Sequence, residues 1–303
     1  MIDIAILTPH PAEADEEASW RKVLARLQSA LAEEGMATTP VPWTAHAEDP
    51  APLLRHACVL PLLAWGYHKQ QARWLRACEA WRQAGVAMAN PAGVLAWNSD
   101  KRYLATLADR GVAVPATQWT SMPTRERLER AFAETGAEAL IVKPSVSGGA
   151  WKTLRVHRDD PLDAVIADAA PGIEMLIQPY LPTIASEGET SLLFFGGRLS
   201  HAVNKRPVAG DFRVQEQFGG QYRVRAAPPA GALALAEQTL AAVGQPLLYA
   251  RIDMVPDADG RWLLMEAELI EPDFYLGADP RRGAGFAQAL RAWLADGCVG
   301  ASA

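Results

Sequence analysis

The residues best suited to chemistry are three carboxylates, Asp253, Glu266 and Glu268, in the segment 251–271 (RIDMVPDADGRWLLMEAELIE). Their alternation with apolar residues predicts a β-hairpin, and Gly260 supplies the positive φ that closes its turn. A hairpin closed there would place all three carboxylates on one face. Carboxylates gathered on an apolar face repel one another, so a cation should neutralise them, and Mg²⁺ is the natural candidate. A solvated hairpin face explains this stretch alone equally well.

Strict alternation also assigns the neighbouring residues of the hairpin to faces. In the first strand Arg251 shares a face with Asp253. In the second strand one face is wholly apolar, carrying Leu263, Met265, Ala267 and Leu269. Trp262 and Leu264 then share the face of the two glutamates.

The composition limits the kind of protein. Half of the 303 residues are hydrophobic, and the formal net charge is -6 with no basic run, so nucleic acid is not expected as a partner. The N-terminal stretch MIDIAILTPHPAEADEE turns acidic where a signal peptide would be apolar, and no apolar run approaches about 20 residues. We therefore expect a cytoplasmic protein with no membrane partner. Cys58, Cys78 and Cys298 are odd in number, which suits incidental thiols in a reducing compartment.

The first part of the chain alternates between strand and helix patterns. Apolar runs predict strands at 2–7, 41–43, 58–64 and 86–89, and helical spacing predicts helices at 20–31 and 71–84. This alternation predicts an open parallel sheet, with ligands beyond the strand ends near loops 8–19 and 65–71. The second loop offers candidates for a substrate wall, although ordinary loop packing explains each better: Trp65, Tyr67, His68 and Lys69.

A boundary is expected at Asn90-Pro91. Beyond it, helices are predicted at 98–110, 124–135, 233–243 and 285–294, and strands at 112–119, 139–143, 175–179 and 191–195. The segment 198–220 is polar and contains glycine, so it is interpreted as a long functional connection.

A small, flexible loop follows the strand that ends at Lys143. Its sequence, 144–150 (PSVSGGA), contains Ser147, Gly148 and Gly149. Paired glycines beside hydroxyl groups can bring backbone N–H groups close to a phosphate, although turn geometry alone also explains them. Walker A, zinc-protease and nucleophile-elbow motifs are absent, so standard P-loop and hydrolase interpretations lose support.

Taken in order, these elements resemble the ATP-grasp superfamily, on its glutathione-synthetase-like side. The resemblance covers residues 98–276 and rests on NSDKRYLATLADRGVAVPAT, LIVKP, SVSGGA, IQPYL, GETSLLFFGG and RIDM…LLMEAEL. Within the superfamily, SHAVNKRPVAGDFRVQEQFGG and ELIEPDFYL look most like the cyclo-ligases of D-cycloserine biosynthesis, which close O-ureido-D-serine into a ring. The resemblance implies an α/β fold, α+β in its C-terminal part. An N-terminal open parallel sheet (1–97) would precede a central lid subdomain (98–180) and a C-terminal subdomain with the metal site (181–303), the last two clasping ATP.

The resemblance also implies nucleotide-binding roles. Lys101 and Lys143 would contact the α- and β-phosphates, and the loop with Ser147, Gly148 and Gly149 would cover the triphosphate. The backbone of a hinge would hold adenine, at Gln178, Pro179, Tyr180 and Leu181. Glu189 would bind the ribose hydroxyls, with Glu187 as its rival and a surface acid as the simpler explanation.

The implied metal site is the acidic hairpin face. Asp253, Glu266 and Glu268 would hold two Mg²⁺ ions, for which Mn²⁺ can substitute; many family members have Asn at the position of Glu268. Arg251 would stabilise charge on the transferred phosphate, although a structural pairing with Asp253 or Glu266 explains it nearly as well. Lys205 and Arg213 would contact the γ-phosphate or the substrate carboxylate, unless they are ordinary loop charges.

The implied activity is ADP-forming carbon–nitrogen ligation, of use in antibiotic biosynthesis. An amino-acid carboxylate would be activated as an acylphosphate and captured by an amine, intramolecularly as in the cyclo-ligases. An intermolecular amino-acid or dipeptide ligase is the related alternative, and a catalytically silent ATP-binding regulatory protein is the alternative from another class. The expected partner is a small amino-acid-like substrate, and the family allows a homodimer.

Overall fold

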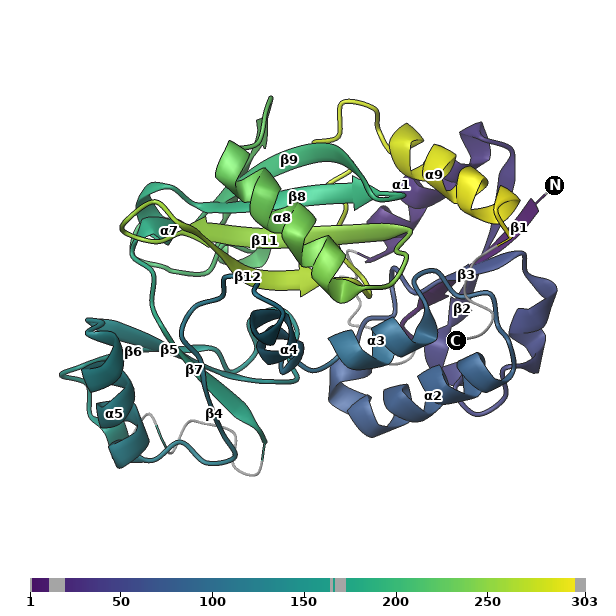
Figure 1. Cartoon of the computed structure of the whole chain (residues 1–303). Coiled ribbons are helices and arrows are strands. Elements are labelled where there is room, and N and C mark those ends of the chain that lie inside the picture. The colour runs from purple at the N-terminus through teal and green to yellow at the C-terminus, as the bar shows by residue number, and fades with distance from the viewer. Residues whose placement is uncertain (1, 11–19, 164–165, 167–172, 298–303) are drawn as a thin grey trace.

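The computed structural model describes residues 2–10, 20–163, 166 and 173–297, and in them the strands form three sheets (Figure 1). The predicted architecture is confirmed: a parallel N-terminal sheet is followed by two antiparallel sheets with their helices. Cys298 and most of the predicted ligand loop 8–19 lie outside the described residues. Within the described ranges, no helix is both long enough and apolar enough to cross a membrane.

The N-terminal sheet has the order β2–β1–β3 and is parallel throughout. Its strands are β1 (Ile2–Thr8), β2 (Met36–Pro42) and β3 (Cys58–Leu60), and its helices are α1 (Trp20–Glu33), α2 (Gln71–Gln83) and α3 (Ala92–Asn98). Short 3₁₀ helices are η1 (Trp43–His46), η2 (Ala51–Arg55) and η3 (Tyr67–Gln70). The strand expected at 41–43 begins earlier and ends as η1 starts. The strand expected at 86–89 is reduced to one bridge between Val59 and Met88. Cys58 and Cys78 are buried thiols.

The four-stranded sheet has the order β4–β7–β5–β6. Its elements are β4 (Gln118–Thr120), β5 (Ala139–Pro144), β6 (Leu154–His157), β7 (Met175–Pro179) and α5 (Arg125–Thr135). Thr124 caps α5 by accepting a hydrogen bond from the Arg127 amide at 3.3 Å, and Gly136 ends the helix at φ 64°. The prediction of a strand over 112–119 is wrong in its extent, because only 118–120 pair with a neighbour. Pro115 interrupts the run before it.

The five-stranded sheet has the order β10–β9–β8–β11–β12, and α8 lies across it (Figure 1). Its elements are α7 (Thr183–Ser186), β8 (Glu189–Phe195), β9 (Arg198–Arg206), η4 (Glu216–Phe218), β10 (Gln221–Arg225), α8 (Ala230–Val243), β11 (Tyr249–Pro256) and β12 (Trp262–Glu268). The interpretation of 198–220 as one long connection is wrong for its first part, which is β9. β8 and β9 form a hairpin across the turn Gly196-Gly197, and pairing with β8 satisfies the backbone of β9, which the polar composition conceals.

Helices α4 and α9 pack against the sheets. The helix predicted at 98–110 is shorter: α3 ends at Asn98, and α4 (Tyr103–Asp109) follows a turn in which Asp100 Oδ1 accepts from the Arg102 amide at 2.9 Å. Tyr103, Leu104 and Leu107 pack into the core of the five-stranded sheet. The C-terminal helix α9 (Ala284–Ala295) shares a core with α1 and the N-terminal sheet. The turn before α4 is therefore held against the acidic hairpin.

The hairpin contains a β-bulge that the alternation pattern does not predict. Asp253 pairs with Glu266, but the next residue, Met254, pairs with Leu264, so Met265 is the extra residue. The bulge reverses the alternation beyond it. Leu264 therefore joins Ala267 in the core under α8, and its predicted place beside the glutamates is wrong. Met265 instead lines the cavity described below.

Candidate functional site

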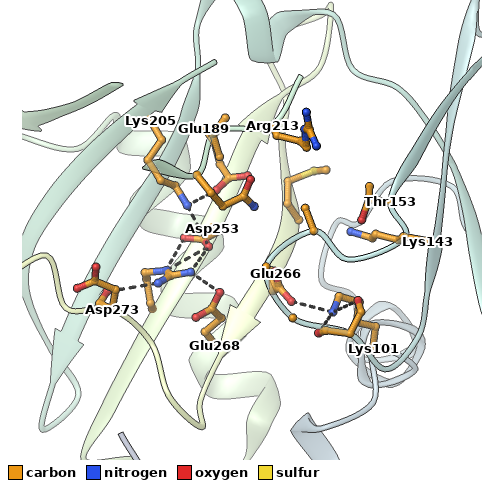
Figure 2. A pocket seen from close by; sticks show the side chains of 18 of the residues that line it. Lys101, Lys143, Thr153, Glu189, Lys205, Arg213, Asp253, Glu266, Glu268 and Asp273 are labelled. Atoms are coloured by element: carbon orange, nitrogen blue, oxygen red, sulfur yellow. Dashed lines mark hydrogen bonds and ion pairs between the residues drawn. The ribbon is translucent and has the colours of Figure 1, made fainter. Parts of the chain in front are cut away.

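One cavity of about 800 Å³ lies between the three sheets. Every residue proposed from the sequence for nucleotide, metal or catalytic contacts is among those lining it: Lys101, Lys143, Ser147, Gly148, Gly149, Gln178, Pro179, Tyr180, Leu181, Glu189, Lys205, Arg213, Arg251, Asp253, Glu266 and Glu268. They come from segments far apart in the chain and from different sheets. Figure 2 shows the charged members pointing toward one another across the cavity.

Asp253 lies at the centre of a buried charge cluster. Arg251 donates to it from Nε and Nη2 at 3.0 to 3.2 Å, Lys205 Nζ lies 3.3 Å away, and Ser191 donates at 2.5 Å. Burial opposes ionisation, but the charges of Arg251 and Lys205 outweigh it and lower the pKa of Asp253 to about 2. The carboxylate is therefore ionised and already paired. The structural pairing of Arg251 with Asp253, which the sequence left open, is therefore present.

Glu268 shares the same arginine. Its Oε1 accepts from Arg251 Nη2, and the strand register places the two residues opposite each other. Burial raises the pKa of Glu268 to about 7 in spite of Arg251, and the neighbouring Glu266 adds to the effect. A cation bound at this face would favour its ionised form.

Lys101 connects the acidic face to the glycine loop. Its Nζ lies 3.3 Å from Glu266 Oε1 and donates to the Ser147 carbonyl at 3.1 Å. Lys143, at the end of β5, has no ion pair with any described residue. Burial lowers its pKa. An anion such as a phosphate would supply the partner that Lys143 lacks.

The two rival ribose-binding glutamates differ in position. Glu189 lines the cavity and forms an ion pair with Lys205, whereas Glu187 is exposed and does not line it. Although burial disfavours the ammonium form, Asp253 and Glu189 raise the pKa of Lys205 well above its usual range. Lys205 is therefore a charged residue of the cavity wall and not a loose loop charge.

Arg213 occupies the connection between β9 and β10. Its guanidinium donates to Asp211 Oδ2 at 2.8 Å and stacks on Phe218, 3.8 Å from the ring centroid. At the hinge, Gln178 is buried, and its side chain donates to Thr117 at 3.0 Å. The backbone of Gln178 and Pro179 pairs with β5, and the Tyr180 amide donates to the Ala139 carbonyl at 2.9 Å, while residues 178–181 line the cavity.

The N-terminal loop reaches the cavity only in part. Trp65 and Tyr67 line it, whereas His68 and Lys69 do not. His68 instead packs on the glycine loop: a Cβ added at Gly148 would lie 2.9 Å from His68 Cε1. A side chain at Gly148 would therefore displace the His68 imidazole from the glycine loop.

The acidic face fits Mg²⁺ in its chemistry. Hard carboxylate oxygens, one or two per ion with phosphate oxygens completing the shell, are the donors this ion prefers. In the described part of the chain, no three His, Cys, Asp or Glu side chains converge on a single point as a metal cage. Asp253, Glu266 and Glu268 instead lie along one face, each beside a cationic side chain. Such a face suits ions that share their ligands with a nucleotide.

Several cavity residues were not identified from the sequence. Ser191, Thr153, Glu271, Asp273 and Tyr275 contact the charge cluster or line the cavity. A signal exists for Glu271, the acid that follows the two glutamates in ELIEPDFYL. No sequence signal marks Ser191, because its contact with Asp253 depends on the pairing of β8 with β11.

Comparison with known proteins identifies related sequences. Residues 4–90 match the family model described as the N-terminal domain of D-cycloserine synthetase DcsG. The cycloserine biosynthesis protein DcsG of Streptomyces lavendulae is 33% identical over 244 residues, covering 75% of this chain and 79% of that protein.

Solved structures agree in fold. A crystal structure of D-cycloserine synthetase DcsG superposes with a TM-score of 0.79 at 28% identity, covering 96% of this chain and 99% of that one. D-alanine–D-alanine ligase from Bacillus anthracis, complexed with ATP, gives 0.66 at 16% identity over 99% and 98% of the two chains, which shows a shared fold. The chain therefore belongs to the family of the cycloserine biosynthesis protein DcsG, among the ATP-grasp ligases.

Proposed function

We propose that this ATP-dependent carbon–nitrogen ligase activates the carboxylate of a small amino acid as an acylphosphate and captures it with an amine of the same molecule. The observation that carries the proposal is the cavity itself, where unpaired Lys143, the Lys101–Glu266 pair and the glycine loop adjoin the acidic face. ATP-grasp ligases use ATP with a divalent metal. The relationship to DcsG favours an O-ureido-amino acid as substrate and ring closure as the outcome.

The nucleotide would lie between the four- and five-stranded sheets. In this proposal the backbone of 178–181 holds adenine, Glu189 holds the ribose, and Lys101 and Lys143 contact the phosphates. Ser147, Gly148 and Gly149 cover the triphosphate and exclude water, which would otherwise hydrolyse the acylphosphate. Asp253, Glu266 and Glu268 would hold two Mg²⁺ ions, which when bound neutralise the triphosphate and polarise the transferred group; Mn²⁺ would substitute.

The remaining cations would act on the reacting groups. The substrate carboxylate attacks the γ-phosphorus, and ADP leaves with the bonding electron pair of the broken P–O bond. Arg251, Lys205 and Arg213 stabilise the negative charge on the phosphoryl oxygens and orient the carboxylate. The amine then attacks the acyl carbon, phosphate departs, and the amine loses a proton. Arg251 and Lys205 are held for this by Asp253.

The test is ADP release across a panel of D- and L-amino acids that includes O-ureido-D-serine, with Mg²⁺ and ATP present. We expect ADP release with at least one member, and a hydroxamate when hydroxylamine traps the acylphosphate. A product lighter than its single substrate would support ring closure, whereas a mass that joins two substrates would assign an intermolecular ligase. ATP binding without ADP release on any substrate would contradict the ligase proposal.

A further inference from the structure

Glu271 differs from the other acids of the cavity in having no partner. It lines the cavity on the loop after β12, and its carboxylate makes no hydrogen bond and no ion pair with a described residue. Asp253, Glu266, Glu268 and Glu189 each have a lysine or arginine beside them. An acid in such a place, desolvated but unpaired, is costly unless a cation arrives.

Aromatic side chains line the same cavity as Glu271. They are Trp65 and Tyr67 of the N-terminal loop, and Glu271 is the charge that acts most strongly on the partly buried Tyr67. A carboxylate near the ring of Tyr67, in a cavity that Trp65 also lines, is suited to bind an alkylammonium group, through charge and through cation–π contact. This surrounding does not suit a phosphate.

The Glu271 loop also adjoins the charge cluster. Figure 2 shows Asp273, two residues further on, on the opposite side of Asp253 and Glu268 from Lys101 and Lys143. The Asp273 carbonyl accepts from Arg251 Nη1 at 3.3 Å, which fixes the loop to the charge cluster. Glu268 and Arg251 are the charges that act most strongly on Glu271, so its carboxylate lies near the proposed site of phosphoryl transfer, where the amino-acid part of the substrate would lie.

We propose that Glu271 binds the α-ammonium group of the amino acid whose carboxylate is activated, an inference that rests on the proposed function. Ligation consumes the carboxylate and leaves the α-ammonium of that amino acid intact, whether the attacking amine is internal or external. A partly buried acid that pairs with this group also explains how the enzyme would reject carboxylic acids without it, because the acid would then stay unpaired.

The test compares Glu271→Gln with wild-type enzyme in ADP release, varying the best amino acid of the panel and ATP separately. We expect KM for the amino acid to rise about 100-fold, the effect of removing one side of a buried charge pair, with KM for ATP within about twofold. Glu237→Gln, an exposed acid of α8, is the matched control and should change neither. Glu271→Asp keeps the charge, so its KM for the amino acid should lie between the values of the wild-type enzyme and Glu271→Gln.

A second comparison uses the substrate. The wild-type enzyme should discriminate by about 100-fold against the desamino analogue, in which hydrogen replaces the α-ammonium, and Glu271→Gln should lose this discrimination. An unchanged KM for the amino acid, or a rise in KM for ATP alone, would overturn the assignment while the ligase function stands. If Glu271→Gln does not fold, equal use of both substrates by the wild-type enzyme would overturn it. Absence of ADP release by the wild-type enzyme would instead overturn the proposed function, and this inference with it.

Discussion

Lys101 and Glu266 form an ion pair of 3.3 Å between the turn before α4 and strand β12. The same ammonium donates to the Ser147 carbonyl at 3.1 Å, so one side chain joins the acidic face to the glycine loop. Binding of a metal by Glu266 and of a phosphate by Lys101 would each alter this link. The pair therefore couples the two parts of the proposed nucleotide site.

Replacing Glu266 with Gln tests the metal face. The substitution keeps the size of the side chain but removes the charge, so we expect Mg²⁺-dependent turnover to fall at least about 100-fold, with a higher Mg²⁺ requirement. ADP release measured over a Mg²⁺ titration gives both quantities, with Glu237→Gln as control. Unchanged ATP affinity together with unchanged turnover would show that Glu266 holds no metal.

Gly148→Ala tests the contact between the glycine loop and the N-terminal loop. The added methyl would lie 2.9 Å from His68 Cε1, so the His68 imidazole must turn away from the glycine loop or the loop must shift. We expect KM for ATP to rise about tenfold, and the double variant Gly148→Ala with His68→Ala to recover most of the loss. If the double variant is as impaired as the single one, the defect lies in the backbone of Gly148 and not in its contact with His68.

The lowered pKa of Lys143 predicts that alkaline pH has opposite effects on folding stability and on nucleotide binding. Burial lowers its pKa, so the unfolded chain holds this proton to higher pH than the folded chain does. Stability of the free protein should therefore rise as pH increases through the lowered pKa. ATP affinity should fall over the same range, because only the ammonium form attracts phosphate.

Lys143→Met should remove both pH dependences. Calorimetric ATP titrations and denaturant unfolding from neutral to alkaline pH measure them, and Lys69→Met, at an exposed position outside the cavity, is the control. Persistence of the alkaline loss of ATP affinity in Lys143→Met would assign it to another group.

Asn90 should contribute strongly to stability. It is fully buried, donates to the carbonyls of Tyr249 and Leu269 at 2.9 Å each, and accepts from the Leu248 amide at 2.8 Å. Asn90→Ala leaves these backbone groups unsatisfied, so the free energy of unfolding should fall by about 3 kcal/mol.

Denaturant unfolding followed by tryptophan fluorescence measures this change. Gln238→Ala is the control, since its amide donates to the Gly111 carbonyl at the surface, and it should cost no more than about 0.5 kcal/mol. A loss below about 1 kcal/mol for Asn90→Ala would mean that other groups or water satisfy the same backbone.

The sequence determined the order and kind of most elements, because these depend on local patterns. Alternating residues and the Gly260 turn predicted the acidic hairpin, apolar runs predicted the parallel sheet, and the sequence PSVSGGA predicted a close-approach loop. The hairpin acids and the glycine loop could be named from their own neighbours, whereas the roles expected of Lys101, the hinge at 178–181 and Glu189 came from the resemblance to the ATP-grasp superfamily. The shared face of Arg251, Asp253 and the two glutamates followed from the same alternation, whereas the pairing of Arg251 with Glu268 did not.

Tertiary structure alone decided how these groups meet. The bulge at Met265 moved Leu264 into the core, since strand pairing and burial under α8 outweigh strict alternation. β9 forms a local hairpin with β8, but only the pairing of β8 with the distant β11 brought Lys205 to Asp253. His68 reaching Gly148, and Glu271 standing without a partner, depend on packing between distant segments. Such contacts join residues that are distant in the sequence, so the local sequence around each residue does not predict them.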